Sequence, residues 1–226
     1  MMGKLKHVYF SYILDKNTPT YGNRNHFFCE KKSDISKGDV ANDSSLETTV
    51  HIGTHLDMPY HFFENGQTIE DFGIEDFKFK KVLFINISPQ SLILKDDLIS
   101  LLEEKKDKEL YDILIVKTGI CHKRETEEFW ASNYGFHPIV AVYLKEKFPN
   151  IRFLGFDSIS VSSFKERMLG REAHKAFLYP SNPILLLEDM DLTMLKEDSK
   201  IEWIDIIPLR IRKCDGLPCT VIGEYR

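Results

Sequence analysis

Three histidines and one aspartate lie close together in the segment HIGTHLDMPYH, which spans residues 51–61. They are His51, His55, Asp57 and His61. Imidazole nitrogen and carboxylate oxygen are ligand types that zinc and manganese accept readily. A lone histidine is usually an ordinary surface or core residue, but three within so short a segment, interleaved with aspartate, glycine and proline, are harder to explain in that way. The spacing therefore favours a metal site.

Backbone geometry limits how these side chains can cooperate. In a straight strand, His51 and His55 would lie about 13 Å apart, which is too far to share an ion. In a helical turn, the rise between them is only about 6 Å. We therefore predict that the segment turns or coils, because Gly53 permits an unusual backbone and Pro59 would stop any helix. Asp57 can then join the same cluster or bridge to a second ion.

The same segment resembles the signature HxGTHxDxPxH of the cyclase family, which includes bacterial kynurenine formamidases and isatin hydrolase. The likeness continues along the chain to the C-terminus. Residues 155–160 (GFDSIS) are similar to the family's G-I-D-T-x-S segment, 117–119 (KTG) to its R-T-G, and 215–218 (DGLP) to its D-G-x-P. His174, followed by a strand that ends at Glu188, resembles the family's downstream histidine and glutamate.

The resemblance implies a centre with two ions, zinc in the first place and manganese as an alternative. The implied ligands are His51, His55, Asp57, His174 and Glu188, with Asp57 bridging the two ions. His61 is implied to be the general acid/base and not a ligand. The residues themselves support part of this, since Glu188 follows the apolar run 184–187, and a carboxylate at the end of a buried strand is costly unless it is paired or bound to a metal.

The implied activity is hydrolysis of a small amide by metal-activated water. The resemblance favours an arylformamidase that converts N-formylkynurenine to kynurenine and formate, a reaction of tryptophan catabolism. Two alternatives stay open: a hydrolase of cyclic amides or lactones similar to isatin hydrolase, and a non-catalytic metal-binding protein of the same fold. A serine nucleophile is a weaker hypothesis because the sequence contains no G-x-S-x-G motif.

The elements that must position these residues alternate along the middle of the chain. Apolar and β-branched runs predict strands at 7–14, 46–52, 82–87, 112–117, 152–156, 184–187, 201–211 and 220–225. Helical spacing predicts helices from about 96, at 124–132, at 138–148 and at 171–179, and Pro138 suits a first helical turn. The run 82–87 is nearly all apolar, so we expect that strand to be buried on both faces. Strands dominate both ends, so we expect an α/β fold with one mixed-sheet domain over residues 1–226, of the cyclase type.

Composition sets the remaining expectations. The 226 residues carry a formal charge of −5 without a concentrated basic stripe, which argues against nucleic-acid binding. The four cysteines are too sparse for a disulfide scaffold, and no stretch approaches the roughly 20 apolar residues that cross a bilayer. We expect a soluble cytoplasmic protein that acts on a small molecule. The family resemblance implies a homodimer or homotetramer, with partner residues closing each pocket.

Overall fold

One large mixed sheet contains most of the strands of this protein. The computed structural model describes residues 4–24 and 26–226. The strands of the sheet are β1 (Lys6–Tyr9), β4 (His55–Asp57), β5 (Lys78–Phe79), β6 (Val82–Asn86), β8 (Ile113–Lys117), β10 (Phe153–Phe156), β11 (Leu185–Glu188), β12 (Ile201–Pro208) and β13 (Gly216–Tyr225). Their order is β5-β12-β13-β4-β11-β10-β8-β6, and β1 pairs with β13 outside this path. The α/β fold with a mixed sheet is confirmed.

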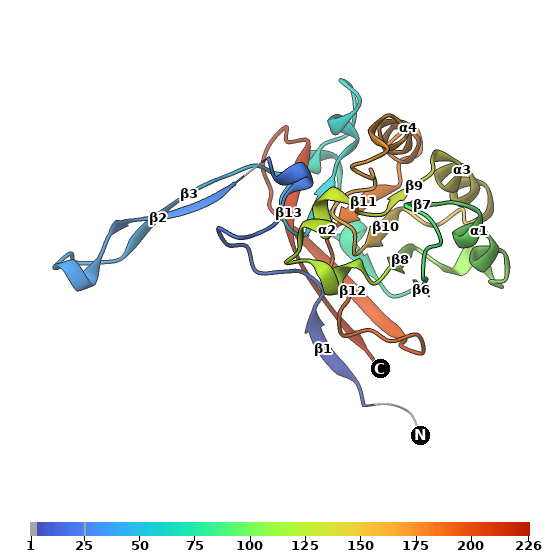
Figure 1. Cartoon of the computed structure of the whole chain (residues 1–226), viewed down its shortest axis with the longest axis horizontal. Coiled ribbons are helices and arrows are strands. Elements are labelled where there is room, and N and C mark those ends of the chain that lie inside the picture. Colours follow the sequence, from blue (N-terminus) through green and yellow to red (C-terminus); the bar gives the residue numbers. More distant parts are fainter. Residues whose placement is uncertain (1–3, 25) are drawn as a thin grey trace.

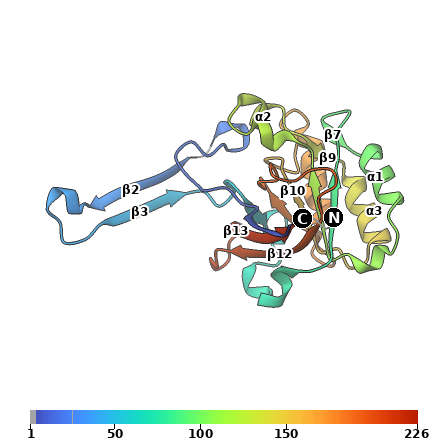
Figure 2. The same cartoon turned by 90° about the horizontal axis from the view of Figure 1, so that it is seen from below.

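Half of the sheet is parallel and is built from strand–helix–strand units. β6, β8, β10 and β11 run parallel to one another. The helices between them are α1 (Asp96–Glu103), α2 (Glu127–Ala131), α3 (Pro138–Lys147) and α4 (Arg167–Phe177). Figures 1 and 2 show α1 and α3 together at one end of the molecule. Every residue of β8 is buried, as expected for a central parallel strand whose two faces are both covered.

The other half of the sheet is antiparallel, and β4 joins the two halves. β4 pairs antiparallel with β11 on one side, where Asp57 lies opposite Leu186. On its other side it pairs antiparallel with β13, where Asp57 lies opposite Gly216. All three residues of β4 are buried. The segment that carries the candidate ligands is therefore held on both sides by strands from distant parts of the chain.

Two smaller strand pairs lie outside the large sheet. One is β7 (Ile93–Leu94) with β9 (Gly135–Phe136), and the other is the hairpin of β2 (Phe27–Ser33) and β3 (Asp43–Thr48). This hairpin projects far from the rest of the molecule (Figures 1 and 2). Phe28, Val40 and Leu46 on it are largely exposed.

The predicted elements are present with shifted ends, and the burial predicted for one strand is wrong. The strand expected at 7–14 ends at Tyr9, and the helix expected at 124–132 is shortened to α2. The run 82–87 was expected to be buried on both faces, which is wrong: in β6, Leu83 and Ile85 are buried but Val82 and Phe84 are only partly covered. β6 ends the strand order, so it has a neighbouring strand on one side only.

Short 3₁₀ turns connect many of these elements. They are Tyr21–Asn23, Ile35–Lys37, Pro59–His61, Ile69–Asp71, Ile74–Phe77, Lys108–Leu110 and Ile120–Lys123. None of the helices in the described part of the chain combines the length and apolar character that a membrane span requires. The cytoplasmic location expected from the sequence stays a prediction.

Candidate metal centre

The segment 51–61 changes direction before it enters β4. Residues 51–54 form a bend, and Gly53 has a φ of 57°, in the left-handed region. A Cβ atom there would lie 2.2 Å from Leu14 Cδ2, so glycine is required for both conformation and space. The predicted turn is confirmed, but the chain leaves it as a strand and not as a helix. Pro59 begins the short turn Pro59–His61 instead of ending a helix.

The imidazoles of the bend and of α4 converge on the carboxylate of Asp57. His51 Nδ1 lies 2.8 Å from Asp57 Oδ1, and His55 Nε2 lies 3.5 Å from the same oxygen. His174 Nε2 approaches Asp57 Oδ2 to 3.3 Å. Glu188 comes from the end of β11, with Oε2 3.5 Å from His55 Nε2. The fold thus brings all five predicted ligands around one carboxylate, although it draws them from three separate parts of the sequence.

Two atoms at the centre have no hydrogen-bond partner among the described residues. They are His55 Nε2 and Asp57 Oδ2, and both are buried. His174 Nε2 approaches Asp57 Oδ2 without hydrogen-bond geometry. A buried polar atom left unsatisfied costs about 1–3 kcal/mol. A divalent cation would satisfy an imidazole nitrogen and a carboxylate oxygen together, so the residues present fit a metal ion.

Ligand atoms gather in two groups that share Asp57. In each, the nitrogen and oxygen atoms lie within 4.8 Å of one another. One group is His55, Asp57 and Glu188, and the other is His51, Asp57 and His61. The sharing of Asp57 fits the predicted bridging role. The family resemblance implies other sets, with His51 and His55 on one ion and His174 and Glu188 on the second. In the structure His55 groups with Glu188, His61 joins His51, and His174 falls in neither group.

Further hydrogen bonds fix the orientation of the rings. Nδ1 of His55 lies 2.8 Å from the carbonyl of Gly53. Nδ1 of His174 lies 2.9 Å from the carbonyl of Gly170 and 3.3 Å from Ser162 Oγ. Since each Nδ1 is occupied in this way, each Nε2 is turned toward the centre. Such outer contacts commonly set the tautomer and the direction of metal-binding histidines.

Asp215 is a site residue whose role was not predicted from the sequence. Its Oδ2 lies 2.9 Å from His51 Nε2 and 3.0 Å from His61 Nδ1. It immediately precedes β13, which pairs with β4, and this pairing brings it to the histidines. The sequence feature that could have pointed to Asp215 is the DGLP run, which resembles the family's D-G-x-P.

The two other motif segments contact each other beside the centre. Asp157 accepts hydrogen bonds of 2.8 Å from the amide and the hydroxyl of Thr118 and from the amide of Gly119. These bonds tie the GFDSIS segment to the KTG segment. Val161, which follows GFDSIS, donates its amide to Glu188 Oε1 at 2.8 Å. The motifs therefore support the loop that holds Glu188.

Charge in the centre is balanced by protons when no cation is bound. Burial opposes ionisation of Asp57, but the nearby charge of His51 holds the pKa of Asp57 well below its ordinary value. Burial and the Asp57 charge raise the pKa of Glu188 well above its ordinary value. Burial lowers the pKa of His51, but the carboxylates of Asp57 and Asp215 outweigh it and raise that pKa to about 10. Cation binding would displace such protons.

A cavity of about 430 Å³ opens onto these residues. Its wall includes Phe62, whose ring stacks on that of His174 with centroids 4.6 Å apart. Tyr21 and Ile159 add apolar surface on other sides. A concave, partly apolar cavity of this size with convergent polar groups suits a small aromatic molecule.

Comparison with known proteins places this chain in a family. The cyclase family model matches residues 8–163. The chain belongs to the cyclase family. A kynurenine formamidase from Bacillus cereus is 29% identical over 181 residues, which cover 80% of this chain and 79% of the relative. A kynurenine formamidase from a second Bacillus cereus strain is 26% identical over 214 residues, 92% of each chain.

Solved structures share the cyclase-family fold over nearly the whole chain. Isatin hydrolase A from Labrenzia aggregata superposes with a TM-score of 0.78 at 20% identity, covering 97% of this chain and 93% of that one. A potential metal-dependent hydrolase with cyclase activity gives a TM-score of 0.76 at 21% identity and covers 99% of both. The chain is a cyclase-family hydrolase with side-chain groups able to hold metal ions.

Proposed function

We propose that this protein is a metal-dependent arylformamidase, which hydrolyses N-formylkynurenine or a closely similar aryl formamide. The observation that carries the proposal is the pair of unsatisfied buried atoms, His55 Nε2 and Asp57 Oδ2, at the floor of a cavity sized for a small aromatic amide. The kynurenine formamidase relatives support the choice of substrate.

The proposed ligands divide between two positions that share Asp57. The family resemblance would assign His51 and His55 to one and His174 and Glu188 to the other, whereas the ligand atoms that lie together within 4.8 Å include His55 with Glu188. Zinc is the expected ion and manganese the alternative, since both accept imidazole and carboxylate ligands. A divalent ion bound there lowers the pKa of water toward about 7, so that a hydroxide nucleophile is available near neutral pH.

His61 is the proposed general acid/base. Hydrogen bonds with His51 and His61 lower the pKa of Asp215, which therefore stays a carboxylate and accepts a hydrogen bond from Nδ1 of His61. The other nitrogen, Nε2, is left to exchange protons with the reacting atoms. In the reaction, the oxygen of water bonds to the formyl carbon and the C–N bond breaks. His61 passes a proton from that water to the departing nitrogen, giving formate and an aromatic amine.

The deciding experiment compares His61→Ala with the wild type. We expect turnover of N-formylkynurenine to fall by about 10²–10⁴-fold while metal content, measured by elemental analysis, stays unchanged. His7→Ala is the control, because His7 is a largely exposed histidine paired with Glu224 outside the cavity. Unchanged turnover in His61→Ala would remove this residue from the mechanism.

A substrate panel separates the remaining alternatives. Purified wild-type protein is assayed on N-formylkynurenine, isatin and a set of lactones. Preference for isatin or a lactone would replace the arylformamidase proposal by cyclic amide or ester hydrolysis. Absence of bound metal, together with no activity after zinc or manganese is added, would leave a non-catalytic member of the family.

A further inference from the structure

Three arginines line the cavity above the candidate metal centre. They are Arg24, Arg167 and Arg171. Arg167, Arg171 and His174 are spaced by four and three residues on α4, so they share one face of that helix. With a rise of 1.5 Å per residue, the Cα atoms of Arg171 and Arg167 lie about 4.5 and 10.5 Å along the axis from that of His174. α4 thus extends a row of positive charge away from the metal centre.

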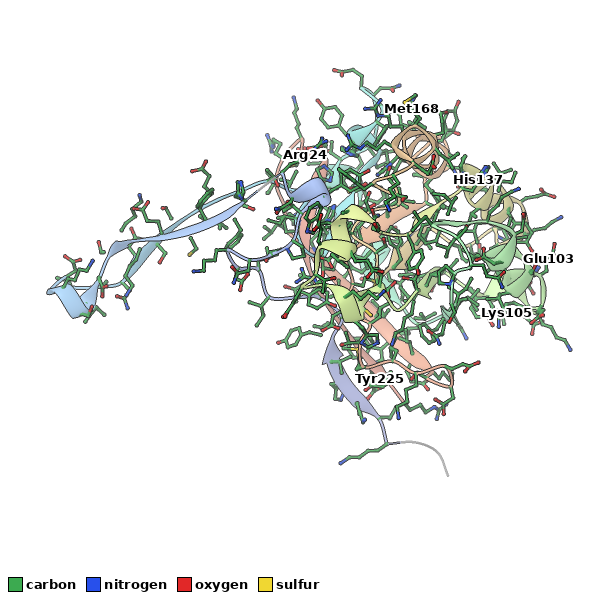
Figure 3. All side chains as sticks on the ribbon, in the orientation of Figure 1. Arg24, Glu103, Lys105, His137, Met168 and Tyr225 are labelled. Atoms are coloured by element: carbon green, nitrogen blue, oxygen red, sulfur yellow. The ribbon has the colours of Figure 1, made fainter. Side chains whose placement is uncertain are left out.

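The third arginine reaches the same wall from a different part of the chain. Arg24 lies at the base of the β2–β3 hairpin (Figure 3). Its guanidinium lies 5.9 Å from the centre of the Phe164 ring, and that of Arg167 lies 4.0 Å from the same ring. Phe164 therefore contacts two guanidinium groups without neutralising either.

Within the described residues, none of the three guanidinium groups has a carboxylate within 4.0 Å. Arg167 donates to the carbonyl of Phe164 at 3.3 Å, and Arg171 contacts Met168 Sδ at 3.6 Å. Four other arginines are paired with carboxylates, namely Arg124, Arg152, Arg212 and Arg226. All three side chains in the group are exposed, so their donors face solvent at the cavity.

The three arginines could instead serve to neutralise the buried carboxylates of Asp57 and Glu188, but this explanation is weaker. Imidazoles already contact both carboxylates, and cations bound there would neutralise them further. Arginine carries a planar fork of donors that matches a carboxylate in geometry. An anionic group entering with the ligand is therefore the partner that these arginines lack.

We propose that Arg167 and Arg171, assisted by Arg24, bind a carboxylate of the substrate, so that the substrate is an aryl formamide that carries a carboxylate group. The inference rests on the proposed function and narrows it. N-formylkynurenine has such a carboxylate, whereas formanilide and isatin have none.

Kinetics of the metal-loaded enzyme test the proposal. For Arg171→Gln, we expect KM for N-formylkynurenine to rise about tenfold while kcat stays within twofold of the wild type. In the double variant Arg167→Gln/Arg171→Gln, KM should rise further. Turnover of formanilide should not change. Lys165→Gln is the matched control, because it removes an exposed neighbouring cation that does not line the cavity. Equal effects on the two substrates, or none on either, would overturn the proposal.

A binding measurement decides the question even if the arylformamidase proposal fails. Calorimetry compares kynurenine with 2-aminoacetophenone, which keeps the aryl amine and ketone but lacks both the carboxylate and the α-ammonium group. The double arginine variant isolates the part of the difference that is due to the carboxylate. We expect kynurenine to bind the metal-loaded wild type about tenfold more tightly, and the difference to persist in Lys165→Gln but disappear in the double arginine variant. Equal affinity for the two compounds, or a difference that the double variant keeps, would refute an arginine site for the carboxylate.

Discussion

Replacing Arg124 with alanine tests how far a buried carboxylate beside the metal centre depends on one cation. Asp189 follows the predicted ligand Glu188, and its side chain is 1% exposed. Arg124 Nε and Nη2 donate to its two oxygens at 2.9 and 2.7 Å. The guanidinium also lies 3.8 Å from the centre of the Tyr12 ring. Arg124→Ala removes both contacts and leaves the carboxyl group buried.

The structure sets the size of the effect and its dependence on pH. An uncompensated buried charge costs about 3–5 kcal/mol. Asp189 can avoid this cost by taking up a proton, which at pH 7.5 costs about 5 kcal/mol for a carboxyl with an ordinary pKa of 3.8, but at pH 5 only about 1.6 kcal/mol. Loss of the contact with Tyr12 adds about 0.5–1 kcal/mol at either pH.

The direction of the pH effect follows from proton uptake. Burial raises the pKa of Asp189 already in the wild type, and removing Arg124 raises this pKa further. Between the unfolded and the folded pKa, the folded variant binds more protons than the unfolded chain, so its stability falls as pH rises. The deficit relative to wild type should therefore be largest near neutrality and shrink toward pH 5.

Urea unfolding of the metal-free proteins at about pH 5 and pH 7.5 measures this deficit. Arg152→Ala is the control, because Arg152 pairs with Asp76 at 2.7 Å in an exposed position. Exposed pairs contribute below about 1 kcal/mol. A loss in Arg124→Ala below about 1 kcal/mol at pH 7.5, or one that is the same at both pH values, would refute the reasoning.

Three further predictions concern the support of the site and the assembly of the protein. A Cβ atom at Gly170 would lie 1.9 Å from Ser162 Oγ, so Gly170→Ala must displace α4. We expect this variant to lose about 1–3 kcal/mol of stability in thermal unfolding and to bind less metal. Gly73→Ala is the control, because the nearest atom there is 3.6 Å away, and its stability and metal content should not change. Asp215→Asn should lower kcat about 10–100-fold in the formamide assay, and a change below twofold would contradict its orienting role. Replacing the projecting hairpin of residues 27–48 with a tight turn should convert a homodimer or homotetramer to a monomer in light scattering, and an unchanged mass would show that the hairpin is not an assembly element.

The local sequence was sufficient to predict a structural feature wherever the interactions that control the feature are short in range. Gly53 and the histidine spacing predicted a bend because only a turned backbone can bring His51 and His55 together, and their ring centroids lie 5.2 Å apart. Pro138 predicted the start of a helix, and α3 begins there. Residue 188 was predicted to carry a buried carboxylate because it follows an apolar strand, and it does.

The sequence by itself therefore determined the types of group that bind a metal, the turn that carries three of them and the alternation of strands and helices. Tertiary structure decided that Asp215 meets His51 from 164 positions away, because β13 pairs with β4 in one particular register. It also decided that β6 lies at an end of the strand order and that Arg24 joins the arginines of α4 on one wall. These outcomes depend on long-range strand pairing and helix packing. The residues that make these contacts lie far apart in the chain, so no local sequence pattern predicts them.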